Sequence, residues 1–182
     1  LNAFDDGPRV VLDVVRHPRM FDHDTRGPNE GPPALWRWTI DTEAGTVREE
    51  QLDDRAIEFP RVDERLVGRP HRFGWATGLD ASGPDVGFDG FSMVRYDRHT
   101  GGSEVVSLGE GRIGGEFVFV PRSADAAEDD GWYLTLAQDR TTDRGELVVL
   151  DASAPGEGPV ARVHLPGRIP LGFHGNWVHT GR

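Results

Sequence analysis

The chain has 182 residues, of which 36% are hydrophobic and none is cysteine, and its formal net charge at pH 7 is −11. This length suits one domain or part of a larger one. The negative charge argues against a nucleic-acid partner, because phosphate contacts need clustered Lys and Arg. The lack of cysteine excludes a disulfide framework and a thiolate metal site, and it is compatible with the cytoplasm. The longest apolar runs have strand length, so no membrane-spanning helix is predicted.

Three similar strand–turn–strand units follow one another along the chain. Each has an apolar run that ends in Asp, a turn containing Gly, and a second strand-like run, as expected for antiparallel hairpins. The first runs of the three units are 35–41, 91–97 and 147–151, and the second runs are 47–52, 105–108 and 160–165. A further strand is predicted over 132–138. A repeat in the fifties is typical of a β-propeller, so the predicted fold class is all-β, with about three blades in this chain.

The segments between the strands are predicted to be irregular. The stretches 19–33 and 80–90 are rich in Gly, Pro and charge, so we expect long connections there. The one weak helical signal, 123–129, is better interpreted as a loop or a single turn. The recurring Asp41, Asp97 and Asp151 are expected to bond local backbone N–H groups at strand ends, which is a structural role.

A glutamate or histidine recurs at a fixed interval after these hairpins. The interval from Glu58 to Glu116 and that from Glu116 to His174 are both 58 residues (116 − 58 and 174 − 116). Each follows the second strand of its hairpin, where a propeller chain returns to the inner strand of the next blade beside the central channel. A single such residue is ordinarily a solvated edge residue. The shared register instead predicts that all three point toward a common axis.

Residue count and the abrupt start at Leu1 lead us to expect a partial propeller domain over 1–182, a C-terminal fragment of a larger single-domain protein. A closed propeller needs at least four blades. The remaining histidines do not share the register of His174, and we expect them to be incidental. They are His17, His23, His71, His99, His164 and His179.

Five strings carry a resemblance to a known family. They are Asn2-Ala3-Phe4-Asp5-Asp6-Gly7, Glu58-Phe59-Pro60 with Gly68-Arg69-Pro70, 116–122, 128–132 and 170–177. In this order they resemble the C-terminal part of the carotenoid cleavage oxygenases, a family that includes the lignostilbene dioxygenases and the retinal pigment epithelium retinoid isomerase.

The resemblance implies a seven-bladed propeller with iron(II) on its axis, held by four histidines, three of which bond to glutamates. His174 matches the last liganding histidine, and Glu58 and Glu116 match two of the glutamates. The family's third histidine precedes the Asn-Ala string in a His-x-x-Asn-Ala arrangement, two residues ahead of Leu1. The other three histidines and the third glutamate are thus expected outside this chain, and the fragment alone is expected to be inactive and unable to hold iron tightly.

The implied reaction is the addition of O2 across a conjugated C=C bond of an apolar carotenoid, apocarotenoid or stilbenoid, giving two carbonyl products. Phe173, beside His174, is a candidate to line the substrate passage, although an aromatic residue there also suits a structural role. The resemblance further predicts peripheral membrane contact through segments outside this chain.

Two other kinds of function fit parts of the pattern. A non-enzymatic propeller used as a binding scaffold has the same blades, but has no need of two glutamates and a histidine in one register. A propeller glycosidase uses axial carboxylates as acid and base, a role open to Glu58 and Glu116. That function gives no reason for the string around His174.

Overall fold

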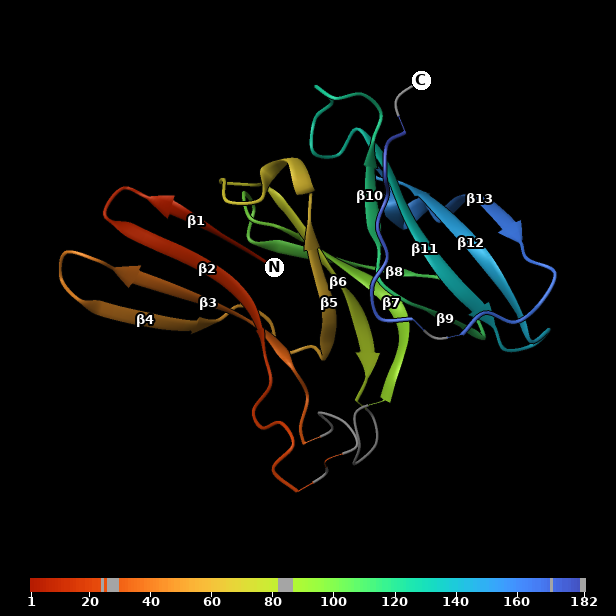
Figure 1. The fold of residues 1–182 in the computed structure, drawn as a ribbon, viewed down its shortest axis with the longest axis horizontal. Helices are drawn as coiled ribbons and strands as arrows, with labels where there is room; N and C mark the ends of the chain where they lie inside the picture. The colour runs from red at the N-terminus through yellow and green to blue at the C-terminus, as the bar shows by residue number, and fades with distance from the viewer. Residues whose placement is uncertain (24, 26–29, 82–86, 171, 181–182) are drawn as a thin grey trace.

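The computed structural model describes residues 1–23, 25, 30–81, 87–170 and 172–180. Twelve of the thirteen strands in the described part form three antiparallel groups of four, the blades, which lie side by side in Figure 1. The first blade contains β1 (Asn2–Asp6), β2 (Arg9–Arg16), β3 (Ala34–Asp41) and β4 (Thr46–Gln51). The second contains β5 (Ile57–Val62), β6 (Phe73–Asp80), β7 (Gly87–Asp97) and β8 (Gly102–Ser107). The third contains β10 (Val118–Pro121), β11 (Gly131–Asp139), β12 (Arg144–Asp151) and β13 (Pro159–His164).

The short strand β9 (Arg112–Gly114) links the second and third blades into one sheet. It pairs with β11 along its length and meets β7 where Gly114 lies opposite Gly90. A Cβ atom added to Gly90 would lie 2.6 Å from the carbonyl oxygen of Gly114. This approach requires glycine, because two backbones meet where a side chain has no room.

The three predicted hairpins and the strand over 132–138 are confirmed. The stretch 123–129 forms turns and bends, as expected, and the described residues of 19–33 form the connection between β2 and β3. The prediction of a connection over 80–90 was wrong at its ends, because Asp80 still belongs to β6 and β7 begins at Gly87. Residues 24, 26–29 and 82–86 of these connections lie outside the described part. Two short 3₁₀ helices not expected from the sequence are η1 (Glu64–Leu66) and η2 (Pro155–Glu157).

The second blade is buried on both faces because its side chains alternate between two hydrophobic clusters. Trp75 and Met93 pack toward the third blade, whereas their neighbours Ala76 and Val94 pack toward the first, and all four are at most 1% exposed. Successive side chains of a strand point to opposite faces, so one strand supplies both interfaces. The blades therefore stack through the faces of their sheets.

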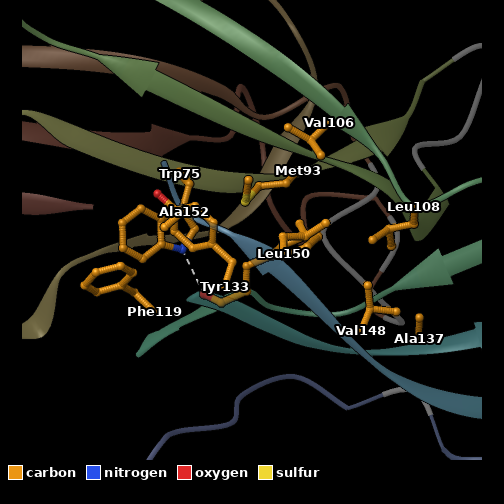
Figure 2. Packing of buried hydrophobic residues seen from close by; sticks show 11 residues of the cluster. Trp75, Met93, Val106, Leu108, Phe119, Tyr133, Ala137, Val148, Leu150 and Ala152 are labelled. Carbon is orange, nitrogen blue, oxygen red and sulfur yellow. Dashed lines mark hydrogen bonds between the residues drawn. The ribbon is translucent and has the colours of Figure 1, made fainter. Parts of the chain in front are cut away.

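Three aromatic side chains, Trp75, Phe119 and Tyr133, pack together at the interface between the second and third blades (Figure 2). The ring of Trp75 lies 4.7 Å from that of Tyr133 and 5.9 Å from that of Phe119, between centroids. The Trp75 indole N–H donates to the carbonyl oxygen of Phe117 at 2.8 Å, which satisfies its one polar group. Large aromatic side chains contribute most to such interfaces when their polar ends are bonded.

The three recurring aspartates have the structural role predicted for them. Asp41 accepts from the N–H of Ala44 at 2.8 Å, Asp97 from that of His99 at 2.8 Å, and Asp151 from that of Ser153 at 2.9 Å. Each carboxylate thus closes the turn after its strand, as Asp side chains commonly do. Hydrogen bonds favour the charged form and lower the pKa of all three carboxyl groups. The largest cause is the Ala44 N–H for Asp41 and the Ser153 hydroxyl for Asp151. For Asp97 the hydrogen bond from Arg72 is the largest cause, and its pKa falls to about 2.

Polar groups join the first blade to the second. The Asn2 amide nitrogen donates to the carbonyl oxygens of Leu66 and Arg69 at 3.2 and 3.0 Å and lies 3.0 Å from His71 Nδ1, and the amide oxygen accepts from Gly68 N–H at 3.1 Å. Two of the sequence strings that carry the family resemblance, 2–7 and 68–70, therefore meet here. His71 is only 6% exposed, so its burial lowers the pKa of the imidazole to about 4.

Stability is expected to fall in mild acid because of His71. Its ordinary pKa is 6.5, so between about pH 6.5 and 4 the unfolded chain binds a proton that the folded chain does not. The neutral ring's contribution is complete above pH 6.5 and is lost as the pH falls toward 4, an effect of about 1–3 kcal/mol. The free energy of unfolding of the intact protein and of a His71→Phe variant, measured by urea unfolding from pH 7 to 4, tests this prediction. An equal pH slope for both proteins would contradict the assignment.

Candidate metal-ligand site at the inner strands

Glu58 lies at a bulge in the inner strand of the second blade. In the pairing of β5 with β6, Glu58 faces Thr77 and Arg61 faces Trp75, so that two residues of β5, Phe59 and Pro60, correspond to one residue of β6. Proline has no N–H to give to the ladder, and Phe59 has a positive φ of 53°. An extra residue turns the strand locally and redirects its side chains. The string Glu58-Phe59-Pro60 is thus the bulge itself.

Glu116 occupies the corresponding place in the third blade. The inner strand there is interrupted between β9 and β10, and both pieces pair with β11. Gly114 faces Ala137 and Val118 faces Leu134, so the three residues 115–117 lie opposite only two of β11. This is again one extra residue. The equal spacing of the two glutamates therefore reflects an equivalent irregularity in successive blades.

The carboxylate of Glu116 holds the segment after β13 against the third blade. Oε1 lies 3.2 Å from His174 Nδ1, and Oε2 accepts from Gly175 N–H at 2.9 Å. The carboxylate itself is only 4% exposed, and the guanidinium of Arg61 lies 2.8 Å from Oε2. Segment 172–177 runs alongside β10 in Figure 1. The structure thus brings Glu116 and His174, which are 58 residues apart, into contact, whereas a common axis for all three residues of the register stays a prediction.

Arg61 is a site residue that the sequence analysis missed. Besides the ion pair with Glu116, its guanidinium donates to the carbonyl oxygen of Gly175 at 3.0 Å and pairs with Glu64. Arg61 thus contacts both Glu116 and segment 172–177. These contacts, together with those of Glu116 itself, are called the clamp below. The available signal was its position three residues after Glu58, just beyond the bulge, but the interval of 58 residues does not include it.

His174 itself projects outward from this clamp. Its side chain is 76% exposed, and its ring lies 5.8 Å from the ring of Phe59, edge to face. The ring of Phe173 lies 6.4 Å from Phe59. A mostly apolar cavity of about 380 Å³ opens next to Glu116 and His174. It lies between Ile169, Pro170 and segment 172–177 on one side and residues of β9 to β12 on the other. Phe173 lines this cavity, as do Val118, Leu134, Leu136, Leu147 and Ile169.

Glu58 contacts an imidazole too, and its identity was not expected. His17 Nε2 bonds to Oε1 of Glu58, while Oε2 accepts from Phe59 N–H at 3.0 Å. The His17 ring is 8% exposed, and its Nδ1 is buried without a hydrogen-bond partner among the described residues. The expectation that His17 is incidental was therefore wrong. The contact depends on packing of the end of β2 against β5, which no spacing within one repeat indicates.

The other histidines divide into one buried residue and four exposed ones. His71 belongs to the interface of the first two blades and does not contact either glutamate of the repeat. His164 lies 3.6 Å from the carboxylate of Glu146 and is 76% exposed. The remaining exposed residues are His23, His99 and His179.

The donor atoms present fit one imidazole position of a metal centre. Because a carboxylate accepts only, the His174 proton lies on Nδ1 and the lone pair on Nε2 points away from Glu116. Neutral imidazole with a carboxylate behind it is a good ligand for iron(II). Among the described residues no three His, Cys, Asp or Glu side chains cluster closely enough to hold a metal ion.

Within the described part of the chain, no helix is long and apolar enough to cross a membrane.

Comparison with known proteins agrees with this arrangement. The family model described as retinal pigment epithelial membrane protein (RPE65) matches residues 1–179. A carotenoid cleavage oxygenase of Mycobacterium tuberculosis is 46% identical over 99% of this chain and 37% of its own length. A lignostilbene-α,β-dioxygenase isozyme III of Sphingomonas paucimobilis is 35% identical over all of this chain and 41% of its own.

The structural comparison gives the same answer. The crystal structure of a cobalt-substituted Synechocystis oxygenase superimposes with a TM-score of 0.86 at 33% identity, over 98% of this chain and 38% of that one. The fold is that of about three blades of a seven-bladed propeller. The chain belongs to the RPE65 and carotenoid cleavage oxygenase family. It spans about two fifths of the length of the curated relatives it matches.

Removal of the Arg61 guanidinium should release segment 172–177 from the third blade. In an Arg61→Met variant, the Gly175 carbonyl loses its donor and the Glu116 carboxylate loses its cation. We expect amide exchange in this segment to quicken by about tenfold, measured by hydrogen–deuterium exchange with mass spectrometry on the intact protein. Arg122→Met, which removes an exposed pair with Asp130, is the matched control. Unchanged exchange in Arg61→Met would refute the clamp.

Proposed function

We propose that this chain is the C-terminal part, within one larger propeller domain, of a non-haem iron(II) dioxygenase. The enzyme would cleave a conjugated C=C bond of a carotenoid, apocarotenoid or stilbenoid with O2 to give two carbonyl products. The observation that carries the proposal is the His174 imidazole held through Nδ1 by a buried carboxylate, in a member of this family. The cobalt-substituted relative supports a metal at the corresponding centre.

In this proposal His174 contributes one ligand nitrogen, Nε2, to iron. Glu116 accepts the Nδ1 proton, which fixes the tautomer and raises the basicity of the ring. Arg61 and Gly175 hold the other carboxylate oxygen, so the glutamate stays oriented toward the ring and does not itself become a ligand. The chemistry that bound iron(II) supplies is the activation of dioxygen for addition across the C=C bond.

Glu58 is proposed to have the same role, on the side of the second blade, for a liganding histidine from another part of the protein. The contact between its carboxylate and the His17 ring supports this role, because it is a contact in which the carboxylate accepts from an imidazole N–H. The remaining liganding histidines and the third glutamate are proposed to lie in other parts of the protein. The fragment alone is then expected to lack activity and tight iron binding.

The apolar cavity beside His174 suits a rigid hydrocarbon substrate. Its wall consists mostly of Leu, Ile, Val and Phe side chains, and the polar Thr135, Gln138 and Asn176 that also line it already form hydrogen bonds within the protein. Phe173 and Phe59 present aromatic rings next to the proposed ligand, where they can orient a conjugated chain and keep water away. The relatives' names refer to carotenoids, apocarotenoids and a lignostilbene, which are substrates of this kind. Peripheral membrane contact through other segments remains a prediction.

The alternative functions lack a comparable observation. An acid–base pair needs two carboxyl groups free to exchange protons. Glu116 is instead bonded to Arg61, Gly175 and His174, and Glu58 to His17 and the Phe59 N–H. A binding scaffold gives no reason for a buried carboxylate behind an outward-facing imidazole.

The metal test compares the intact protein with three variants after anaerobic reconstitution with iron(II). Elemental analysis should find about one iron per chain, and His174→Ala should lose it. Glu116→Gln should bind iron about 10–100-fold more weakly, because an amide is a poorer acceptor for the ring N–H. His99→Ala, at an exposed turn, should behave as the parent. A well-folded parent that takes up no iron would remove the oxygenase proposal and leave the binding scaffold.

Phe173 provides a separate test of the substrate passage. Phe173→Ala should retain its iron but lose about tenfold in kcat/KM for an apocarotenal or a hydroxystilbene, because about 1–2 kcal/mol of apolar contact disappears. Val178→Ala removes an exposed apolar side chain that does not line the cavity and is the control. An unchanged kcat/KM would assign Phe173 a purely structural role.

A further inference from the structure

His17 lies buried between the first two blades, one residue beyond the end of β2. It precedes Pro18, and a residue before proline is restricted to an extended backbone. Side chains alternate along such a backbone, so His17 continues the face of β2 that carries Val15. Val15 packs against the hydrophobic cluster that contains Ile57, the residue before Glu58. The end of β2 therefore directs the His17 ring toward the inner strand of the second blade.

The contact with Glu58 determines which nitrogen of His17 carries the proton. A carboxylate only accepts hydrogen bonds, so in the neutral ring the proton lies on Nε2, which bonds to Oε1 of Glu58. The other nitrogen, Nδ1, is buried and has no hydrogen-bond partner among the described residues. A buried polar atom without a partner lowers stability, and such costs are typical of functional positions. The polar contact that His17 makes in return is the one with Glu58.

Each glutamate of the repeat is held by a side chain from the preceding blade. Arg61 of the second blade lies 2.8 Å from the carboxylate of Glu116 in the third, and His17 of the first blade bonds to Glu58 in the second. A backbone N–H also donates to each carboxylate, at 2.9 Å for Glu116 and at 3.0 Å for Glu58. No arginine pairs with Glu58 within the described part of the chain. His17 therefore takes the place at Glu58 that Arg61 has at Glu116.

Glu58 has surface left for a further donor, whereas His17 has not. The Glu58 side chain is 20% exposed, and each of its oxygens accepts one hydrogen bond among the described groups. A carboxylate oxygen has two lone pairs, so an imidazole N–H from another part of the protein can also bond there. The second nitrogen of His17 is buried. The ring is thus placed to hold the carboxylate and not to bind an ion.

We propose that His17 is a positioning residue, which holds the Glu58 carboxylate in the orientation that its liganding histidine requires. With Oε1 bonded to His17 and Oε2 to the Phe59 N–H, both oxygens are fixed. A fixed acceptor keeps a liganding imidazole in one tautomer and one orientation, which strengthens metal binding. This role of His17 depends on the proposed iron site, to which it adds a residue of the first blade.

The test measures the Kd of Co(II) for the intact protein and for two His17 variants. Co(II) is a suitable probe because a relative has been obtained in cobalt-substituted form. His17→Phe keeps a ring but removes the donor, and Kd should rise about three- to tenfold, less than the roughly 10–100-fold expected for a residue bonded directly to a ligand. His17→Gln places an amide N–H near the position of Nε2 and should restore most of the affinity. His164→Phe, at an exposed histidine of the third blade, is the matched control and should bind as the parent does.

The outcomes separate the role of His17 from the proposed function. A parent that binds no Co(II) would remove the proposed metal site and the role of His17 with it. If the parent binds Co(II), an unchanged Kd in His17→Phe, or an equal loss in both His17 variants, would refute the role of His17 alone.

If His17→Phe does not fold, a crystal structure of the unmodified protein with Co(II) decides. The proposal is supported if His17 Nε2 lies within hydrogen-bond distance of Glu58 while a liganding histidine bonds to the same carboxylate. A His17 ring turned away from Glu58 refutes it.

Discussion

The Glu116 carboxylate is the interaction on which the proposed site depends. Left unpaired, a carboxylate buried to this extent would cost several kcal/mol. It is stabilised here by a cation, a backbone N–H and an imidazole N–H, which come from β5 and from the segment after β13. The same three donors bring the second blade, the third blade and His174 together. The electrostatic requirement of one side chain thus organises the geometry around it.

Much of the fold was predictable because propeller blades are local structures. Each hairpin has its own alternation of apolar residues and its own Asp at the turn, so Asp41, Asp97 and Asp151 could be assigned from the sequence. The interval from Glu58 to Glu116 was informative for a physical reason that became visible only in the strand pairing. Both residues lie where the inner strand has one residue more than its partner.

What could not be predicted depends on contacts between blades. His17 reaches Glu58 only because the end of β2 lies next to β5, and Arg61 reaches Gly175 across 114 residues of sequence. The early start of β7 at Gly87 was missed since Gly, Asp and Phe alternate there without a clear strand pattern. The second-blade strands carry apolar residues at consecutive positions, and only the stacking of blades on both sides explains this.

The connection that β9 makes has a consequence for how this part of the molecule opens. Backbone hydrogen bonds run without interruption from β5 to β13, whereas the first blade is a separate sheet. The first blade is held to the second by side chains and by a few backbone hydrogen bonds, such as that from Ile57 N–H to the Pro33 carbonyl oxygen. Cooperative unfolding units follow such boundaries. The second and third blades therefore form one unit, and the least costly fluctuation separates the first blade along the junction that contains Asn2 and His71.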